Sequence, residues 1–312
     1  MLDKIFDLAI NNNRSNLIII VEGDMRLLKY NNLGPILVMP AMMFIFFIII
    51  LPVFYTFYCS MFDLKYIVFN KFLGLRNYLD ILNDPIIIRS IYYTLSISII
   101  SVIVSLLSAM FLALWIDSRK GIFSYSLQVV GLMPWVTSMV VAGLLWRWIF
   151  DADLGLLNHF FSTIGVNKIN FLGDRYNASI ALMFVMSWRI IGYAMVMILA
   201  GLKSIPQHIE EAAEIDGASP FDLLWRVKIP MIKTQLLLSL IVLTLSNFNN
   251  VTVPMTLTGG GPADATNVIT LEAYRQGFVF YNFGMASALA FVIFIINIVL
   301  VRLYVKMVKY NV

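Results

Sequence analysis

Five stretches of the chain contain no Asp, Glu, Lys or Arg, and each is longer than the ~20 residues that a helix needs to cross a bilayer. A sixth apolar stretch, Asn177–Leu202, is interrupted only by Arg189. Every backbone N–H and C=O must be satisfied internally within lipid, so stretches this long and apolar are helices rather than strands. The sequence therefore predicts an all-α integral membrane protein with about six transmembrane helices. The five uncharged stretches are Leu33–Phe62, Ser90–Ile116, Gly121–Trp146, Thr234–Ala263 and Gln276–Val301.

The composition agrees with a membrane protein and excludes several other classes. Of 312 residues, 60% are hydrophobic and 13% are charged, whereas soluble domains carry about 25% charged residues. The net charge of +4 is too small and too dispersed for nucleic-acid binding, which needs a clustered basic face. With one cysteine, Cys59, and two isolated histidines, His159 and His208, we expect neither a disulfide framework nor a metal site.

The apolar stretches define the expected domain boundaries. Residues 1–32 are predicted to form a polar N-terminal lead-in, either an amphipathic surface helix or a disordered tail, and residues 33–310 the transmembrane domain. No cleavable signal is expected, because the early apolar run Leu17–Val21 is short and acidic residues follow it. The expected spans are about 36–58, 92–115, 126–148, 178–202, 235–257 and 283–305.

The distribution of basic residues orients the spans. Six spans place both termini on one side, together with the 117–120 turn and the segment 203–233. That side carries 13 Lys and Arg, against 8 on the side of the loops 63–89, 147–176 and 264–275. By the positive-inside rule, we expect both termini to be cytoplasmic.

The segment 203–234 between the fourth and fifth spans contains signals for two capped helices. The first is predicted to begin at Ser204, with Gln207 reaching back in a capping box, and to end at Gly217 as a left-handed C-cap. The second is predicted to begin at Ser219, with Pro220 in its first position and Asp222 as the acidic partner, and to end at Pro230. This bent element is either a docking surface or a helix pair that lies on the lipid surface.

The same segment resembles the EAA loop of binding-protein-dependent ABC importer permeases, whose usual form is E-A-A-x-x-x-G followed by I-x-L-P. The matching residues are Glu211-Ala212-Ala213, Gly217 and Val227-x-Ile229-Pro230, with Val for Ile and Ile for Leu. The flanking Asp216-Gly217-Ala218-Ser219 is similar to the sugar-importing branch, as are Gly259-Gly260-Gly261-Pro262 with Thr266, Tyr274–Phe283 and Phe72–Tyr78. The resemblance covers roughly Leu33 to Tyr304.

The resemblance implies a type I ABC importer permease fold, and the first permease of a heterodimeric pair. It implies as partners a second homologous permease, two ATPase subunits and an extracytoplasmic solute-binding protein, in a bacterial plasma (inner) membrane. The chain has no Gly-Lys pair and hence no P-loop, so ATP and Mg are expected on the partner ATPase, with no enzyme activity and no cofactor in this chain. The residues implied in coupling to the ATPase are Glu210, Glu211, Ala212, Ala213, Asp216, Gly217, Ala218, Ser219 and Pro230.

Polar and aromatic residues inside the spans are candidates for the solute path. Arg189 lies near the middle of its span, where an ionisable side chain costs ~2.5 kcal/mol or more and usually faces the bundle interior. It contacts solute or is a structural arginine paired with a carbonyl or water. The Asn residues of the fifth span line the path or join helices to each other. The candidates are Trp188, Arg189, Tyr193, Asn247, Asn249 and Asn250.

We expect import of a sugar or oligosaccharide, because the resemblance is to the sugar-importing branch. Arg189 keeps an anionic solute, such as a sugar acid or glycerol phosphate, as the alternative. A secondary transporter would need intramembrane acids for ion coupling, and the six predicted spans contain no Asp or Glu. A membrane-embedded enzyme lacks paired carboxylates or an H-E-x-x-H motif.

Overall fold

A computed structural model describes residues 33–307 of the chain, and it divides into two compact units, residues 1–56 and 57–312. Each unit is described by itself. The predicted lead-in of residues 1–32 and the last three residues of the predicted transmembrane domain, 308–310, lie outside the described residues.

The described part of the first unit is one continuous helical segment without a charged residue. It consists of α2 (Leu33–Ile45), the π-helical turn η2 (Phe46–Ile50) and α3 (Leu51–Ser60), whose last residues belong to the second unit. Pro52 lies two residues after η2, and the N–H of Leu51 donates to the carbonyl of Phe46. A proline ring clashes with the carbonyl four residues earlier in an α-helix. The wider π turn relieves this clash, so the helix continues through Pro52.

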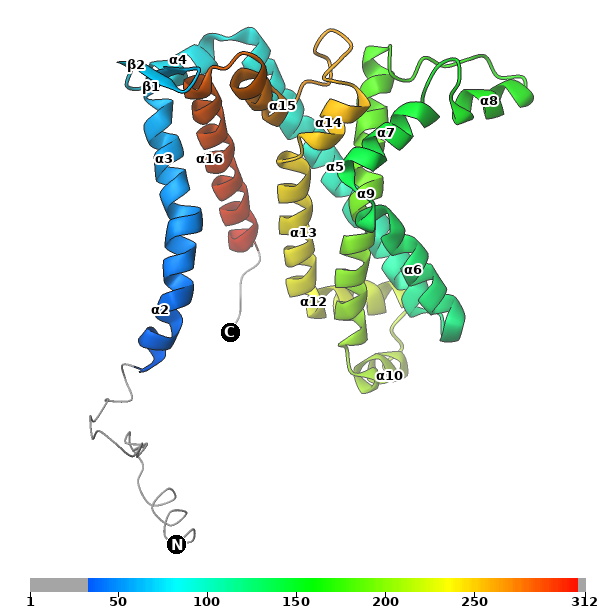
Figure 1. Cartoon of the computed structure of the whole chain (residues 1–312). Coiled ribbons are helices and arrows are strands. Elements are labelled where there is room, and N and C mark those ends of the chain that lie inside the picture. The colour runs from blue at the N-terminus through cyan, green and yellow to red at the C-terminus, as the bar shows by residue number, and fades with distance from the viewer. Residues whose placement is uncertain (1–32, 308–312) are drawn as a thin grey trace, which may run out of the picture. The chain divides into compact units, whose positions relative to one another are not determined.

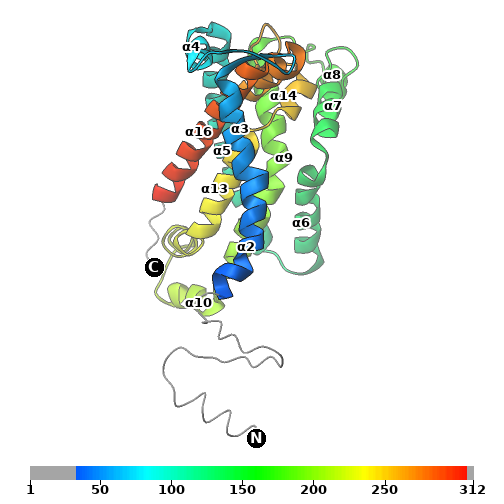
Figure 2. The same ribbon diagram turned by 60° about the vertical axis from the view of Figure 1, so that its left-hand side comes forward.

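Two long helices, α5 (Pro85–Asp117) and α9 (Arg175–Lys203), form the centre of the second unit. Both begin with an aspartate that caps them. Asp84 accepts from the N–H groups of Ile86 and Ile87, and Asp174 accepts from those of Tyr176 and Asn177. Both helices run between the two ends of the unit (Figure 1, Figure 2). Each aspartate satisfies free N–H groups in the first helical turn, which explains why these long apolar helices begin directly after an acidic residue of the preceding loop.

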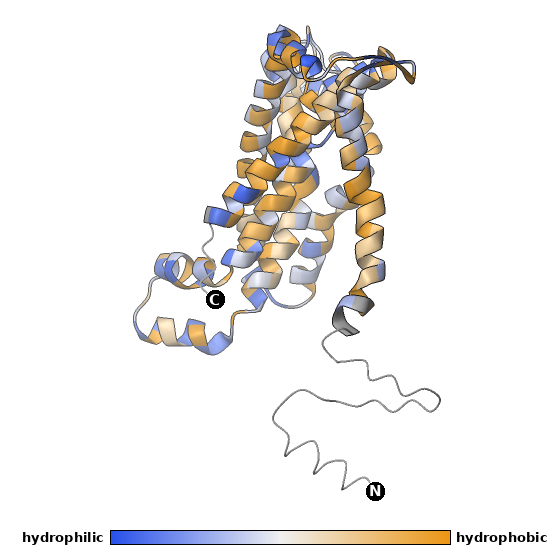
Figure 3. Ribbon diagram, turned by 90° about the vertical axis from the view of Figure 1, so that its left-hand side faces the viewer, coloured by the Kyte–Doolittle hydropathy of each residue, from blue (hydrophilic) through white to orange (hydrophobic). Residues whose placement is uncertain are grey.

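Three apolar clusters hold the second unit together. The first joins the end of α5 near Ile116 to the second half of α9 around Met195 and Ile198. The second packs the first half of α9, around Leu182, against residues of the segment 253–271, among them Leu257 and Val268. The third packs the start of α5 against α16 (Phe283–Met307), with Leu289 at its centre. Figure 3 shows the hydrophobic residues along these long helices and mixed polarity in the connections.

The predicted third span, 126–148, is divided into two helices. The chain forms α6 (Gly121–Val136) and α7 (Met139–Ile149), bent by 95° at the break. Pro134 lies two residues before the end of α6 and lacks the N–H that would continue the hydrogen-bond ladder. At the end of α6 the carbonyl of Met133 accepts from both the N–H of Thr137 at 3.2 Å and its hydroxyl at 2.9 Å.

The predicted fifth span, 235–257, is also divided. Helix α13 (Lys233–Phe248) ends before α14 (Thr252–Leu257), and the segment between them contains Asn249 and Asn250. Within residues 33–307, four helices are long and apolar enough to cross a membrane, and up to six spans result when each of two bent pairs counts as one. Those pairs are α6 with α7, and the helix Pro220–Met231 with α13. The expected all-α fold of about six spans is confirmed.

The connections gather at two opposite ends of the second unit (Figure 1). One end carries a small antiparallel hairpin, which the all-α prediction did not include, and several short helices. The opposite end carries the helices of the segment 203–234. At the first end are β1 (Phe62–Lys65), β2 (Val68–Phe72), α4 (Arg76–Asn83), α8 (Leu156–Thr163), α15 (Ile269–Tyr274) and η4 (Arg275–Val279); at the second are α10 (Gln207–Ile215), α11 (Pro220–Asp222), η3 (Leu223–Lys228) and α12 (Ile229–Met231).

Close approach of α6 and α9 depends on Gly192. A Cβ at this position would collide with the carbonyl oxygen of Gly131, which is rigid backbone. We expect Gly192→Ala to lower the melting temperature of the detergent-solubilised permease, since overpacking costs about 1–3 kcal/mol. Gly131→Ala is the matched control, because its Cβ would meet only the flexible end of Met195 at 2.9 Å. Equal losses in both variants would contradict this account of the helix contact.

Candidate coupling element and solute path

The helix α10 begins later than predicted. The predicted capping box of Ser204 and Gln207 is wrong, because α9 extends to Lys203 and Ser204 becomes its C-cap, donating to the carbonyl of Gly201 at 2.7 Å. Pro206 is the N-cap residue of α10, without a side-chain cap. The amide of Gln207 donates instead to Glu211 at 2.8 Å, one turn further along the helix.

Gly217 ends α10 as a left-handed C-cap, as the sequence predicts. Its φ is +80°. The N–H of Gly217 donates to Glu214 and that of Ala218 donates to Ala213, both at 3.0 Å. This pair of bonds is the Schellman motif, which satisfies two of the last carbonyls of the helix. A non-glycine residue in this conformation costs about 1–2 kcal/mol.

Ser219 caps the second helix, also as predicted. Its hydroxyl oxygen accepts from the N–H of Asp222 at 3.2 Å and donates to the carboxylate of Asp222 at 2.6 Å. Pro220 occupies the first helical position. The hydrogen bond from Ser219, with Arg226 at 3.1 Å from the carboxylate, lowers the pKa of Asp222 below its ordinary value. The carboxylate is therefore ionised at neutral pH and fixes the start of this helix.

The prediction that Pro230 ends the second helix is wrong, because the helix continues through it to Met231. The preceding turn η3 is π-helical, and the N–H of Ile229 donates to the carbonyl of Leu224. As at Pro52, the wider turn accommodates the proline ring. The element formed by α10, Gly217–Ser219, α11, η3 and α12 is called the coupling element below.

Exposure divides the coupling element into two faces. Glu211, Ala212, Asp216, Gly217 and Ser219 are exposed, whereas Ala213 and Ala218 are half-buried. Glu210 is turned inward and lies 2.9 Å from Lys228. Large apolar side chains that the sequence reasoning did not single out also lie on the exposed face: Ile215, Phe221 and Trp225 are 86%, 70% and 54% exposed. In the sequence, these three residues could have been noticed as apolar residues within the polar segment 203–234.

Both ends of the coupling element are anchored in the apolar core. Ile205 precedes α10 and Ile232 follows α12, and both are buried in the first cluster together with Ile116 of α5. The element therefore leaves and re-enters the bundle at fixed points, while its middle part is exposed.

Arg189 lies on α9 where two apolar clusters meet. Its residue is 9% exposed, with Met186 of one cluster and Ile190 of the other close by in the helix. Its Nε is buried without a hydrogen-bond partner, and no carboxylate among residues 33–307 forms an ion pair with it. The structure therefore shows no intramolecular counter-ion for this guanidinium in the part of the chain that it describes.

Trp188 and Tyr193 pack α9 against the broken third span. Trp188 makes an edge contact with Trp146 of α7, with ring centroids 5.3 Å apart. Tyr193 lies against Trp135 of α6 at 5.5 Å. Both rings are half-buried, so these two solute-path candidates have packing roles on either side of the 95° bend.

The three asparagines of the fifth span are in different environments. Asn249 is exposed and accepts from Asn297 of α16 at 2.8 Å, which joins two spans. Asn250 accepts from the N–H of Val253 at 3.0 Å and so caps α14. Asn247 is buried, and its amide nitrogen has no partner in the described residues. Of the three, Asn247 alone keeps a buried amide nitrogen available, while the partner Asn297 was missed from the sequence because it lies 48 residues away.

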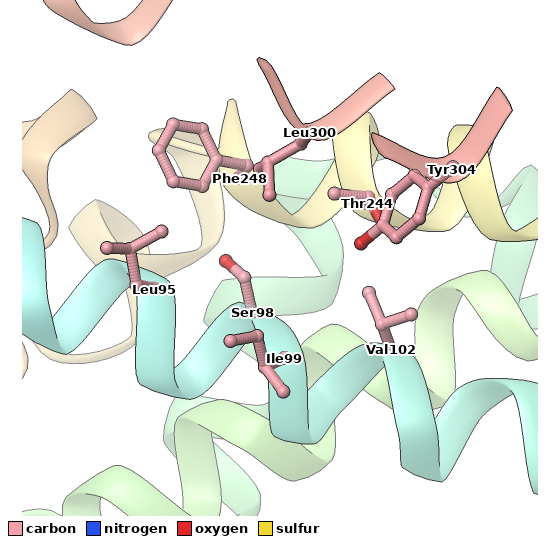
Figure 4. Close-up of a pocket in the computed structure, with 8 residues that line it drawn as sticks. All are labelled: Leu95, Ser98, Ile99, Val102, Thr244, Phe248, Leu300 and Tyr304. Atoms are coloured by element: carbon pink, nitrogen blue, oxygen red, sulfur yellow. The ribbon is translucent and has the colours of Figure 1, made fainter. Parts of the chain in front are cut away.

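A small pocket lies between α5, α13 and α16 (Figure 4). Its walls are mostly apolar, with hydroxyls from Ser98, Thr244 and Tyr304. Thr244 donates to Tyr304 at 3.1 Å, and the buried hydroxyl of Ser98 has no hydrogen-bond partner among the described residues. None of the predicted solute-path residues lines this pocket. Its lining is Leu95, Ser98, Ile99, Val102, Thr244, Phe248, Leu300 and Tyr304.

Comparison with known proteins assigns the class. Residues 106–309 match the family of binding-protein-dependent transport system inner membrane components. The trehalose/maltose transport system permease protein MalF of Thermococcus litoralis is 32% identical, over 91% of this chain and 97% of that protein. The sn-glycerol-3-phosphate transport system permease protein UgpA of Yersinia enterocolitica is 31% identical, over 73% and 77%.

The fold agrees with this assignment. A permease in the crystal structure of a bacterial alginate ABC transporter, solved with an alginate pentasaccharide-bound periplasmic protein, superposes with a TM-score of 0.77 at 20% identity, over 90% of this chain and 95% of that one. The chain belongs to the family of binding-protein-dependent transport system inner membrane components and is a multi-pass permease subunit of an ABC importer. The expected type I permease fold is confirmed.

The Ser219 cap gives a test of the local electrostatics. We expect Ser219→Ala to raise the pKa of Asp222 toward its ordinary value, and Arg226→Gln to raise it less, because the hydroxyl is the larger cause of the lowering. Since the folded pKa is lowered, the cap stabilises the helix above the ordinary pKa and is lost as pH falls through the lowered one. A carbon-13 titration of Asp222 in the reconstituted permease measures both shifts. A larger shift in Arg226→Gln would show that the ion pair dominates.

Proposed function

We propose that this permease imports a sugar or oligosaccharide, and that the coupling element docks into an ATPase subunit that drives it. The observation that carries the coupling proposal is the rigid turn at Gly217, which holds an exposed surface with Ile215 and Phe221 beyond the bundle. Apolar side chains exposed this far on a polar segment favour a protein partner. Glu211 is the polar contact that we assign to the ATPase, since it is exposed on the same element.

The remaining parts of the complex follow from the family. We propose a second homologous permease, two ATPase subunits that bind ATP and Mg, and an extracytoplasmic solute-binding protein. The chain lies in a bacterial plasma membrane with both termini cytoplasmic, so that the coupling element faces the ATPase. The segregation of the coupling element from the hairpin and α8 to opposite ends of the second unit supports this orientation.

The relatives support a carbohydrate as solute. The trehalose/maltose permease covers nearly the whole chain, and the alginate transporter shares its fold. For the path itself we propose Trp188, Tyr193 and Asn247, because an aromatic face and an amide suit a polyhydroxylated solute. Asn249 and Asn250 are assigned a supporting role, because Asn249 is bonded to Asn297 and Asn250 caps α14.

An anionic solute is the second candidate, and Arg189 is the observation that favours it. A buried guanidinium without an intramolecular carboxylate in the described residues can receive one from a solute. One relative, the UgpA permease of Yersinia enterocolitica, is named for transport of an anionic solute, sn-glycerol 3-phosphate. A charged group inside a span is costly, so it is retained where it serves a path or a structural bond.

The role of Gly217 can be tested against a matched turn elsewhere in the chain. Gly165 ends α8 with φ +78° and the same pair of C-cap bonds, from Gly165 to Ser162 and from Val166 to Phe161. A Cβ at either glycine meets nothing within 4 Å. We expect Gly217→Val to reduce ATP-dependent uptake about tenfold, the factor that 1.4 kcal/mol makes in an equilibrium, while Gly165→Val leaves it nearly unchanged.

The measurement uses the complete complex in proteoliposomes with labelled maltose, trehalose and glycerol 3-phosphate. Both variants should reach the membrane in normal amounts, because they carry the same backbone strain. Normal uptake by Gly217→Val would contradict the docking proposal, and equal losses in both variants would attribute the effect to general instability. Transport of none of these solutes by the wild-type complex would overturn the present choice of solute.

Arg189→Gln separates the two solute classes. With an anionic solute, the variant should lose uptake of glycerol 3-phosphate while any uptake of maltose or trehalose is retained, because the amide cannot supply the charge-assisted pair. With a neutral sugar and a structural arginine, uptake and thermal stability should fall together. Unchanged uptake of glycerol 3-phosphate by Arg189→Gln would overturn the anionic candidate.

A further inference from the structure

Four charged side chains meet where the coupling element lies against the bundle. Lys228 of η3 is 2.9 Å from Glu210 of α10 and 3.7 Å from Asp117, the last residue of α5. Lys203, at the end of α9, reaches the other oxygen of Asp117 at 3.7 Å. Two cations and two anions thus connect the coupling element with the C-terminal ends of α5 and α9.

Three of these four charged side chains are largely buried, so their ion pairs are partly shielded from solvent. The side chain of Lys228 is 14% exposed and those of Asp117 and Glu210 are 19% and 27% exposed, whereas Arg226 of the exposed ion pair in the same helix is 81% exposed. Asp117 also lies at the C-terminal end of α5, where the helix dipole disfavours a negative charge. Its carboxylate therefore depends on the lysines that face it, and partly buried pairs are weakened less by solvent and salt than exposed ones.

The backbone next to this group is sharply bent. The helix Pro220–Met231 meets α13 at a bend of 73°, and Ile232 between them leaves the helical conformation with ψ 15°. The buried side chains of Ile205 and Ile232 hold the two ends of the coupling element. Lys228 lies four residues before this bend and contacts a different span.

We propose that Lys228 is the positioning residue that ties the coupling element to the C-terminal end of α5 across this bend. Through the pair with Asp117, a displacement of the coupling element moves α5 rather than bending the chain at Ile232. Glu210 completes the tie by joining α10 to the same ammonium group. The inference rests on the proposed docking of the coupling element to an ATPase.

Helix α5 connects the ion pair at Asp117 with the opposite end of the second unit. The helix has 33 residues and no break from Asp117 to Pro85. Toward its other end, the hydroxyl of Thr94 accepts from the N–H of Ile269 in α15 at 2.8 Å, and Ser98 lines the pocket with α13 and α16. A movement transmitted to Asp117 therefore reaches the opposite end of the unit within one unbroken helix.

The test measures whether the coupling element and α5 move together. Spin labels replace Arg119, in the exposed turn after α5, and Glu214, on the exposed side of α10; the single, buried Cys59 is changed to Ala. The labelled permease is purified as the complete complex in nanodiscs, and the distance between labels is measured with and without ATP. In the otherwise unchanged protein we expect the same distance in both states.

In Lys228→Met we expect this constant distance to be lost, with two different values in the two states, while the ATPase remains bound and hydrolyses ATP. Lys228→Arg should restore one distance, because it keeps the charge and much of the reach. Lys203→Met is the matched control, since it removes another lysine from Asp117 but none from the coupling element. A purely structural role of Lys228 would lower the yield and melting temperature without separating the two distances.

One constant distance in Lys228→Met with the ATPase bound would overturn this inference and leave the proposed function intact. A loss in Lys203→Met equal to that in Lys228→Met would also overturn it, because removal of any lysine from Asp117 would then explain the effect. Absence of an ATPase from the wild-type complex would overturn the proposed docking, and the inference with it.

Discussion

The satisfaction of backbone hydrogen bonds in lipid is the constraint on which this structure depends. An apolar helix can cross a membrane because its N–H and C=O groups bond to each other, and every interruption must find replacement bonds. The side chain of Asn250 supplies one at the start of α14, and the hydroxyl of Thr137 adds a second bond to the last turn of α6. At Pro52 and Pro230 a π-helical turn accommodates the ring without a break. The irregular points of the spans are therefore built from specific side chains, and they are where the chain can change direction.

This constraint also explains which parts of the fold follow from the sequence. The spans, the C-cap at Gly217 and the cap at Ser219 depend on residues within a few positions of each other, so their signals are local. The same local rules failed at Ser204 and Pro230. Ser204 is the C-cap of the preceding helix α9. A π-helical turn, which no residue pattern predicted, accommodates Pro230. The bend between α6 and α7 had a local cause in Pro134, but its 95° angle depends on how both helices pack on α9.

The candidate site was predictable to a different extent in its two parts. The coupling element could be placed by its motif, although its inward and outward faces could not. Nothing in the sequence shows that Glu210 pairs with Lys228 while the adjacent Glu211 is exposed, because the difference arises from the side of α10 that faces η3. The asparagine cluster looked uniform, yet Asn249 and Asn297 are brought together only by the packing of α13 on α16. Residue types that suit a solute are the same types that join helices, so burial and partners had to separate them.

The contacts of the second unit fall into two kinds that respond differently to force. Apolar clusters such as that around Ile116 and Ile198 lose area gradually as helices slide, and dense packing makes them resist deformation as a whole. A partly buried ion pair acts between defined atoms and weakens as those atoms separate into water. The coupling element is held by both: isoleucines fix where it enters and leaves the bundle, and Lys228 pairs with Asp117 at the end of α5. A joint with fixed ends and one directional tie can transmit a push while its outer face stays free to bind a partner. That combination requires Glu210 and Lys228 to face inward while Ile215 and Phe221 stay exposed, which is the arrangement that the two capped helices produce.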